Sequence, residues 1–293
     1  MAQSPAHRFG QIIGDLLERA VEPLLSDFAR THELFLDKKG PRGTRTGNKV
    51  KWKDAFGNSH DLDYVLERNG SQSIAGSPVA FIETAWRRYT KHSRNKAQEI
   101  QGAIQPLTLR YSHSAPFVGI ILAGVFTQGA LTQMASLSFN VLYFPIDTVI
   151  AAFQEVWLDA SFDETTADSE FAKKVHQWNI LTQDERSSVA RSLIFQNRSS
   201  IETFLHALTL SVNRRIEHIR VLPLHGSPSY LTTVEEAVLF INIYDDQAVT
   251  SPIIRYELEI KYNNNDQIEG KFADKELATN FLRMYQPPEL RPA

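Results

Sequence analysis

The 293-residue sequence contains no cysteine and no long apolar run. The absence of cysteine excludes a disulfide framework, a thiolate zinc site and a cysteine nucleophile. The longest apolar run, residues 117–126, is roughly half as long as the ~20 residues that a membrane-spanning helix needs. The N-terminal residues also lack the apolar segment of a signal peptide. We therefore expect a cytoplasmic protein with no membrane partner.

Several catalytic motifs are missing as well. The sequence contains no HExxH, GxSxG, GxxxxGK[ST] or GxGxxG pattern, so a zinc protease, a serine hydrolase, a nucleotide hydrolase and a dinucleotide-dependent dehydrogenase have no support. We accordingly expect no nucleotide cofactor. With 42% hydrophobic and 22% charged residues the chain has the composition of an ordinary globular protein. Its net charge of -3 means that any surface for a polyanion must be local.

Acidic residues in two predicted neighbouring strands are the first indication of a site. Asp61 and Asp63 alternate with apolar residues, a pattern that predicts a strand with both carboxylates on one face. A second apolar strand, residues 79–86, contains a single charged residue, Glu83. A carboxylate in such a run must be paired, protonated or bound to a metal. A salt bridge with a following arginine is the structural alternative to a metal site.

The order of predicted elements indicates the α/β fold class, with a mixed central sheet flanked by helices. Pro23 predicts a kink or break in the first helix, and Pro106 predicts the end of the helix that follows the second strand. The predicted helices are 8–35, 94–105, 127–136 and 146–158, and the predicted strands are 60–68, 79–86, 117–126 and 139–144.

An acidic stretch, residues 159–170, predicts a linker or exposed loop between two regions. The first region is residues 1–158, and residues 171–293 form an α+β region. In that second region we expect helices at 171–178, 184–215 and 275–285, and strands at 219–224, 237–244, 253–262 and 267–272.

Two clusters of cations stand out against the negative net charge. The first lies in a glycine-rich segment, residues 37–54, and the second follows Glu83. A flexible cationic loop suits a polyanion such as DNA, although a solvated loop or hairpin has the same composition. The candidate DNA-binding residues are Lys38, Lys39, Arg42, Arg45, Arg87, Arg88 and Arg94.

The segments DLDYVLE, PVAFIE, HSRNKAQEIQ, FVGIILAG and VLYFP together resemble the PD-(D/E)xK nuclease superfamily, which has a restriction-endonuclease-like fold. The resemblance covers about residues 8–158. It implies that Asp63 and Glu83 hold Mg²⁺ from neighbouring strands. It also implies a lysine two positions after Glu83, where this sequence has Ala85.

Some members of the superfamily supply this lysine from elsewhere, and the resemblance then implies Lys96 first and Lys91 second. Further carboxylate or amide ligands can come from the first helix or from the helix after the second strand. By this resemblance the possible additional site residues are Glu18, Asp61, Gln98 and Glu99.

The resemblance therefore implies a Mg²⁺-dependent DNA endonuclease, of the type II restriction kind, that acts on double-stranded DNA. Cutting both strands of a palindrome needs two active sites related by two-fold symmetry, so we expect a homodimer. Residues 171–293 would provide sequence recognition or dimerisation. Two alternatives remain open: a catalytically inactive nucleic-acid-binding protein on the same fold, in which the lysine is lost, and an adaptor of a defence or repair assembly.

Overall fold

The computed structural model describes residues 4–89, 93–111, 115–224, 226–245 and 255–286. The chain forms two compact units, Met1–Val212 and Asn213–Ala293. The predicted boundary at residues 159–170 is therefore wrong. Those residues do form a loop up to residue 167, but the helices that follow belong to the first unit, because their apolar residues join its core.

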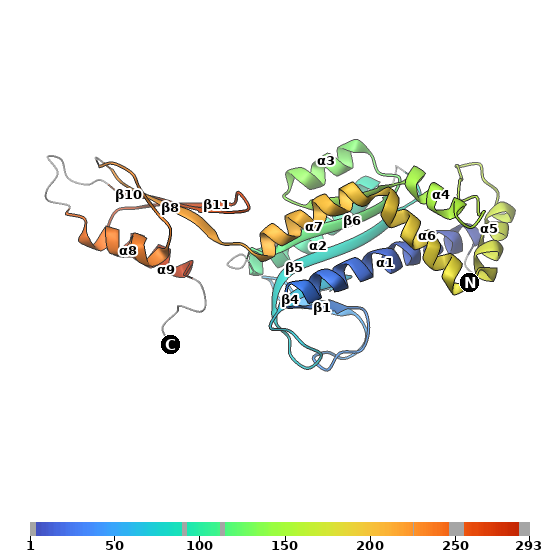
Figure 1. Ribbon diagram of the computed structural model, residues 1–293, viewed down its shortest axis with the longest axis horizontal. Helices are drawn as coiled ribbons and strands as arrows, with labels where there is room; N and C mark the ends of the chain where they lie inside the picture. The colour runs from blue at the N-terminus through green and yellow to red at the C-terminus, as the bar shows by residue number, and fades with distance from the viewer. Residues whose placement is uncertain (1–3, 90–92, 112–114, 225, 246–254, 287–293) are drawn as a thin grey trace. The chain divides into compact units, whose positions relative to one another are not determined.

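A mixed five-stranded sheet forms the centre of the first unit (Figure 1). Its strand order is β1-β4-β5-β6-β7. Strands β1, β4 and β5 pair antiparallel, whereas β5, β6 and β7 pair parallel. The sheet, with helices on both faces, confirms the predicted α/β class. The strands are β1 (Leu34–Lys38), β4 (Tyr64–Arg68), β5 (Ser77–Arg87), β6 (Phe117–Gly124) and β7 (Asn140–Pro145).

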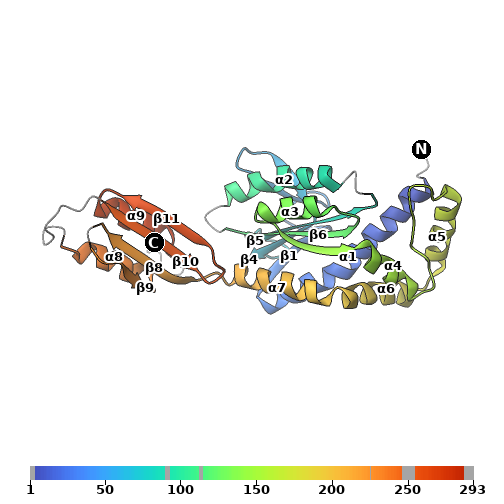
Figure 2. The ribbon, with the colours of Figure 1, turned by 90° about the horizontal axis from the view of Figure 1, so that it is seen from above.

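Helices cover both faces of this sheet, as Figure 2 shows. One face packs against α2 (Ser93–Arg110) and α3 (Gln128–Ser136), and the other against α1, α4 and α7. Helices α5 and α6 pack beside α1 on the second face. The bounds of these helices are α1 (Pro5–Thr31), α4 (Ile146–Gln154), α5 (Asp168–Ile180), α6 (Gln183–Gln196) and α7 (Arg198–Val212).

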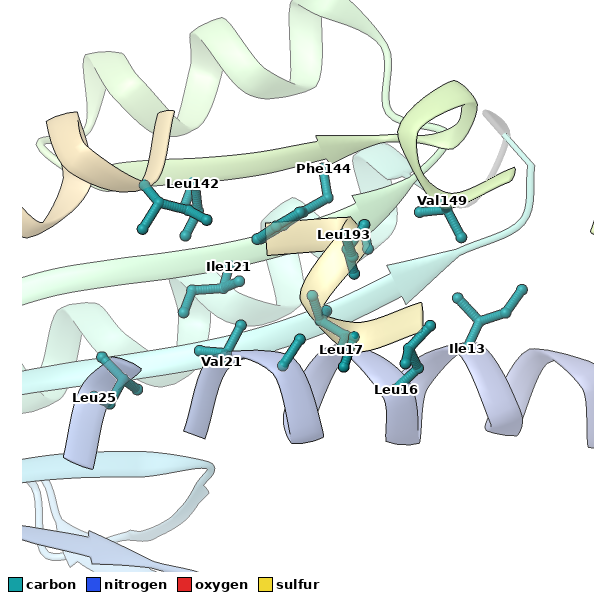
Figure 3. Packing of buried hydrophobic residues seen from close by; sticks show 14 of the residues in the cluster. Ile13, Leu16, Leu17, Val21, Leu25, Ile121, Leu142, Phe144, Val149 and Leu193 are labelled. Carbon is teal, nitrogen blue, oxygen red and sulfur yellow. The ribbon is translucent and has the colours of Figure 1, made fainter. Parts of the chain in front are cut away.

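The larger core lies between α1 and the sheet (Figure 3). Leu17 and Val21 of α1 meet Ile121 of β6, Phe144 of β7 and Leu193 of α6. Each such side chain stabilises the fold by about 1.5–3 kcal/mol when fully buried. This packing fixes α1 against the sheet.

Prolines interrupt neither of the two helices in which they lie. Helix α1 continues through Pro23 and ends at Thr31, and α2 continues through Pro106 to Arg110. The predicted end at Pro106 is therefore wrong, and of the two alternatives predicted at Pro23, a kink or a break, the break is excluded. In both helices the buried apolar stripe continues beyond the proline, and its packing outweighs the lost backbone hydrogen bond.

Residue Glu33, with φ of 54°, reverses the chain after α1. Residues 34–38 are therefore strand β1 rather than the end of the predicted helix 8–35.

The strand predicted for Asp61 and Asp63 is two strands. β3 (Ser59–Leu62) pairs with β2 (Val50–Lys53) in a separate two-stranded sheet, while β4 begins at Tyr64 in the central sheet. Asp63 is the bend between them. Asp61 consequently belongs to the two-stranded sheet, whereas Asp63 directly precedes the first residue of β4 in the central sheet.

The second unit is a four-stranded sheet of order β11-β10-β8-β9 with two helices. Its core contains Val221, Ile241 and Leu282. The predicted strand at 237–244 is wrong, because a capping box of Thr233 and Glu236 starts a helix there. The elements are β8 (Ile216–Pro223), β9 (Ser229–Leu231), α8 (Val234–Ile243), β10 (Tyr256–Tyr262), β11 (Gln267–Phe272) and α9 (Lys275–Met284). Across the described ranges of the chain, no helix is both long and apolar enough to cross a membrane.

Candidate active site

Asp63, the residue before β4, lies beside Glu83, which is inside β5 and follows Ile82, the partner of Tyr64. The Asp63 backbone N–H donates to Glu83 Oε1 at 3.2 Å. Asp63 Oδ2 accepts from the backbone N–H and from the hydroxyl of Thr84, at 2.7 Å each. The predicted pair of carboxylates on neighbouring strands is therefore brought together.

The environment of Glu83 disfavours its charged form. Burial, and then the negative charge of Asp63, raises the pKa of Glu83 from 4.5 to about 8, against the hydrogen bond from Asp63 and the charge of Lys96. Among the residues that the structure describes, Glu83 has no ion pair, so the salt bridge with a following arginine is not formed. A divalent cation at this position would favour ionisation of both carboxyl groups.

Glu18 of α1 is a third carboxylate close to this pair. Although much of its side chain is exposed, desolvation of the carboxyl group and then the charge of Asp63 raise the pKa of Glu18. The positive charge of Lys39 opposes this shift. Glu18 therefore lies within electrostatic range of Asp63, on the α1 side of the sheet.

Lys96 of α2 supplies a cation near Glu83. Its side chain is 15% exposed, its Nζ lies 2.7 Å from Glu99 Oε1, and its charge lowers the pKa of Glu83. Glu99 also lies 4.0 Å from the guanidinium of Arg87. Ala85, at the position of the missing lysine, is buried in the apolar cluster below α2. A lysine from this helix is therefore near the site although the strand lacks one.

The other predicted site residues do not join this pair. Asp61 of β3 forms ion pairs with Lys51 of the paired strand β2 and with Lys49 just before it, and its exposed side chain contacts neither Asp63 nor Glu83. Gln98 is exposed on α2. Lys91 lies outside the described residues.

Two predicted DNA-binding arginines, one buried and one partly buried, are held in ion pairs, which corrects their assignment. Arg42 donates two hydrogen bonds to Glu67, at 2.6 and 2.9 Å, and its side chain is 3% exposed. Arg45 donates to both carboxylate oxygens of Asp37 at 2.6 Å. Both arginines anchor the segment between β1 and β2 and cannot reach a phosphate from these positions. The prediction missed this because Glu67 is distant in sequence.

The remaining predicted DNA-binding residues differ in their accessibility. Arg88 lies over the rings of Tyr89 and Phe171, at 4.6 and 5.1 Å, and so packs inside the unit. Lys38 forms an ion pair with Glu22 of α1, whereas Lys39 is exposed. Arg87 is partly exposed beside Glu99. The side chain of Arg94 is not among those that the structure describes.

The donor set at the site fits a hard cation. Carboxylate oxygens are the protein ligands that Mg²⁺ prefers, and one or two of them suffice because the ion keeps several waters. Within the described residues no group of three or more acidic, histidine or cysteine side chains forms a ready cage for a metal. The pair of Asp63 and Glu83 is therefore the candidate ligand set.

Thr84 is a site residue that the sequence did not reveal. Its hydroxyl and N–H together fix Asp63, yet a threonine in an apolar strand carries no sequence signal for such a role. Only the pairing of β4 with β5 brings it to Asp63.

Comparisons with known proteins add little to this geometry. No family model and no curated protein matches the sequence. A solved structure of a protein of unknown function, AF1548, is similar over 64% of this chain and 99% of that chain, with 11% sequence identity and a TM-score of 0.29. At that identity and score the similarity supports no inference about the site or its activity.

Proposed function

We propose that the protein is a divalent-cation-dependent endonuclease that hydrolyses phosphodiester bonds of double-stranded DNA. The observation that carries this proposal is the juxtaposition of Asp63, at the bend before β4, with Glu83 of the neighbouring strand β5, with the pKa of Glu83 raised to about 8. Two oxygen donors that repel each other in a partly buried position favour a bound cation.

In this proposal Asp63 and Glu83 hold Mg²⁺, and Thr84 fixes the orientation of Asp63 through two hydrogen bonds. The ion, when bound, would neutralise charge on the phosphate and lower the pKa of a bound water. Lys96 would stabilise the negative charge that develops on the phosphate in the transition state. For this step the ammonium group must leave Glu99, its partner in the free protein.

The particular kind of endonuclease is also a proposal. A type II restriction enzyme acts on both strands of a palindrome, which a homodimer would do with one site per chain. The unit Asn213–Ala293 would serve recognition or dimerisation.

A second candidate function is DNA binding without cleavage, or an adaptor role on the same fold. Ala85 stands at the position of the missing lysine, and Lys96, whose charge acts on Glu83, is paired with Glu99. If Lys96 stays paired with Glu99 when DNA is bound, its ammonium group cannot assist phosphodiester hydrolysis.

Incubation of the purified protein with mixed-sequence duplex DNA separates these candidates. The endonuclease proposal expects discrete fragments with Mg²⁺ and none with EDTA. Lys96→Ala should slow cleavage by at least ~10-fold, more than Lys91→Ala does. Retention of intact DNA in a gel-shift assay, with no cleavage under several divalent cations, would instead support the binding role. A stable complex with a partner protein and no DNA binding would support the adaptor role.

A further inference from the structure

The pairing of the antiparallel strands brings a third residue close to Asp63 and Glu83. Lys38 pairs with Tyr64 across β1 and β4, and Tyr64 pairs with Ile82 across β4 and β5. Neighbouring strands lie ~4.8 Å apart. Lys39 directly follows Lys38, Asp63 directly precedes Tyr64, and Glu83 directly follows Ile82. The three residues therefore leave this row of paired residues in the same direction, with Asp63 and Lys39 each at a bend.

A buried anchor fixes the backbone on both sides of Lys39. Arg45 donates to the carbonyl oxygen of Lys38 at 2.7 Å and to that of Gly40 at 2.9 Å. The same guanidinium is held by Asp37, which is 3% exposed. Lys39 thus extends from a segment that is held on both sides, which reduces the entropy lost when a ligand binds.

The charge of Lys39 is available to a ligand, unlike that of its neighbour. Lys38 is occupied by Glu22, whereas Lys39 is exposed and forms no ion pair within the described part of the chain. Lys39 also lies near Glu18 of α1, because its charge lowers the pKa of that carboxyl group, whereas burial and the charge of Asp63 raise it.

We propose that Lys39 is a phosphate-binding residue of the active site, whose ammonium group contacts a non-bridging oxygen of the scissile phosphodiester. The site then has two cations, Lys39 from the bend after β1 and Lys96 from α2. Negative charge increases on these oxygens in the transition state, so a fixed ammonium group there stabilises the transition state more than the ground state. This inference rests on the proposed phosphodiester hydrolysis.

The test compares Lys39→Ala with the native protein in two assays: cleavage of duplex DNA with Mg²⁺, and Mn²⁺ binding measured by electron paramagnetic resonance. Lys53→Ala, which removes an exposed lysine of β2, is the matched control. We expect Lys39→Ala to cleave at least ~10-fold more slowly. Its Mn²⁺ affinity should stay equal or become a few-fold tighter, because a positive charge beside the carboxylates is removed. Lys39→Arg should recover part of the cleavage rate, and Lys53→Ala should match the native protein.

Each other outcome contradicts the inference in a recognisable way. Loss of both cleavage and Mn²⁺ binding in Lys39→Ala would show a structural role, and cleavage at the native rate would show no role. If the native protein cleaves no DNA, the proposed function itself fails, and the inference fails with it.

Discussion

Glu83 combines two properties that are rarely found in one carboxyl group: it lies in an apolar strand and next to another carboxylate. Burial and the charge of Asp63 raise its pKa to about 8. At neutral pH without a cation the folded protein therefore favours a protonated Glu83, and a bound dication would displace that proton. This arrangement of two carboxyl groups favours the binding of a cation and does not stabilise the fold.

Substitution of Glu83 should change how stability depends on pH. The folded-state pKa is about 8 and the ordinary value is 4.5, so the folded state binds more protons between these values. The free energy of unfolding of the native protein should then fall as pH rises from 4.5 to 8. Glu83→Gln lacks this loss. The free energy of unfolding of Glu83→Gln minus that of the native protein should therefore increase by at least ~1 kcal/mol from pH 5 to pH 8.5 in EDTA, measured by urea denaturation.

Asp61→Asn is the matched control for this experiment. The hydrogen bond from Lys49 lowers the pKa of Asp61, so this carboxyl group stays ionised in both states above pH 5. The free energy of unfolding of Asp61→Asn minus that of the native protein should therefore not change with pH over the same range. If the free energy of unfolding of Glu83→Gln changed with pH in parallel with that of the native protein, this result would contradict a raised pKa of Glu83.

At the scale of elements, the segment between β1 and β2 is held by buried charges. Arg42 pairs with Glu67 and Asp37, and all three side chains are at most 4% exposed. Glu67 also accepts from the backbone N–H of Gly76 at 2.6 Å. These contacts join the segment to β4 and to the turn before β5, and so give Lys39 its fixed backbone.

Removal of one partner should be costly because the other stays buried and charged. Arg42→Met should reduce the free energy of unfolding by about 3–5 kcal/mol. Adding Glu67→Gln should restore part of that loss, since a neutral amide needs no cation. Urea denaturation measures both variants. Arg30→Met, which breaks an ion pair on the surface with side chains 78% and 71% exposed, should cost at most about 1 kcal/mol. An equally small cost for Arg42→Met would contradict the anchoring role.

Apolar periodicity predicted most elements of the first unit, because one buried stripe or run marks each. The predictions failed where packing or capping overrode a local signal. Helix α2 passes Pro106 because Ile104 and Leu107 are both buried. Residues 237–244 read as an apolar strand, yet the capping box before them and the core of the second unit select a helix.

The candidate site was only partly predictable for a related reason. A lone Glu83 in an apolar strand is visible in sequence, and so is a nearby aspartate. The choice between Asp61 and Asp63 depends on a bend that separates two sheets. The proximity of Thr84 and of the Lys38–Lys39 segment to Asp63 depends on how β1, β4 and β5 pair, which a single sequence does not contain.

For the whole molecule, the division at residues 212 and 213 assigns the carboxylate pair, Lys39 and Lys96 to one unit. All proposed chemistry therefore belongs to Met1–Val212, while Asn213–Ala293 has its own sheet and core. Any role of the second unit in recognition or dimerisation would be separate from bond cleavage.

The most direct test of the account compares the rates at which the native protein, Glu83→Gln and Asp61→Asn cleave duplex DNA with Mg²⁺. Both variants remove one carboxylate charge, and only Glu83 belongs to the Asp63 pair. The account predicts cleavage by the native protein and by Asp61→Asn at similar rates, and a loss of at least ~100-fold in Glu83→Gln. Equal cleavage by native protein and Glu83→Gln would contradict it.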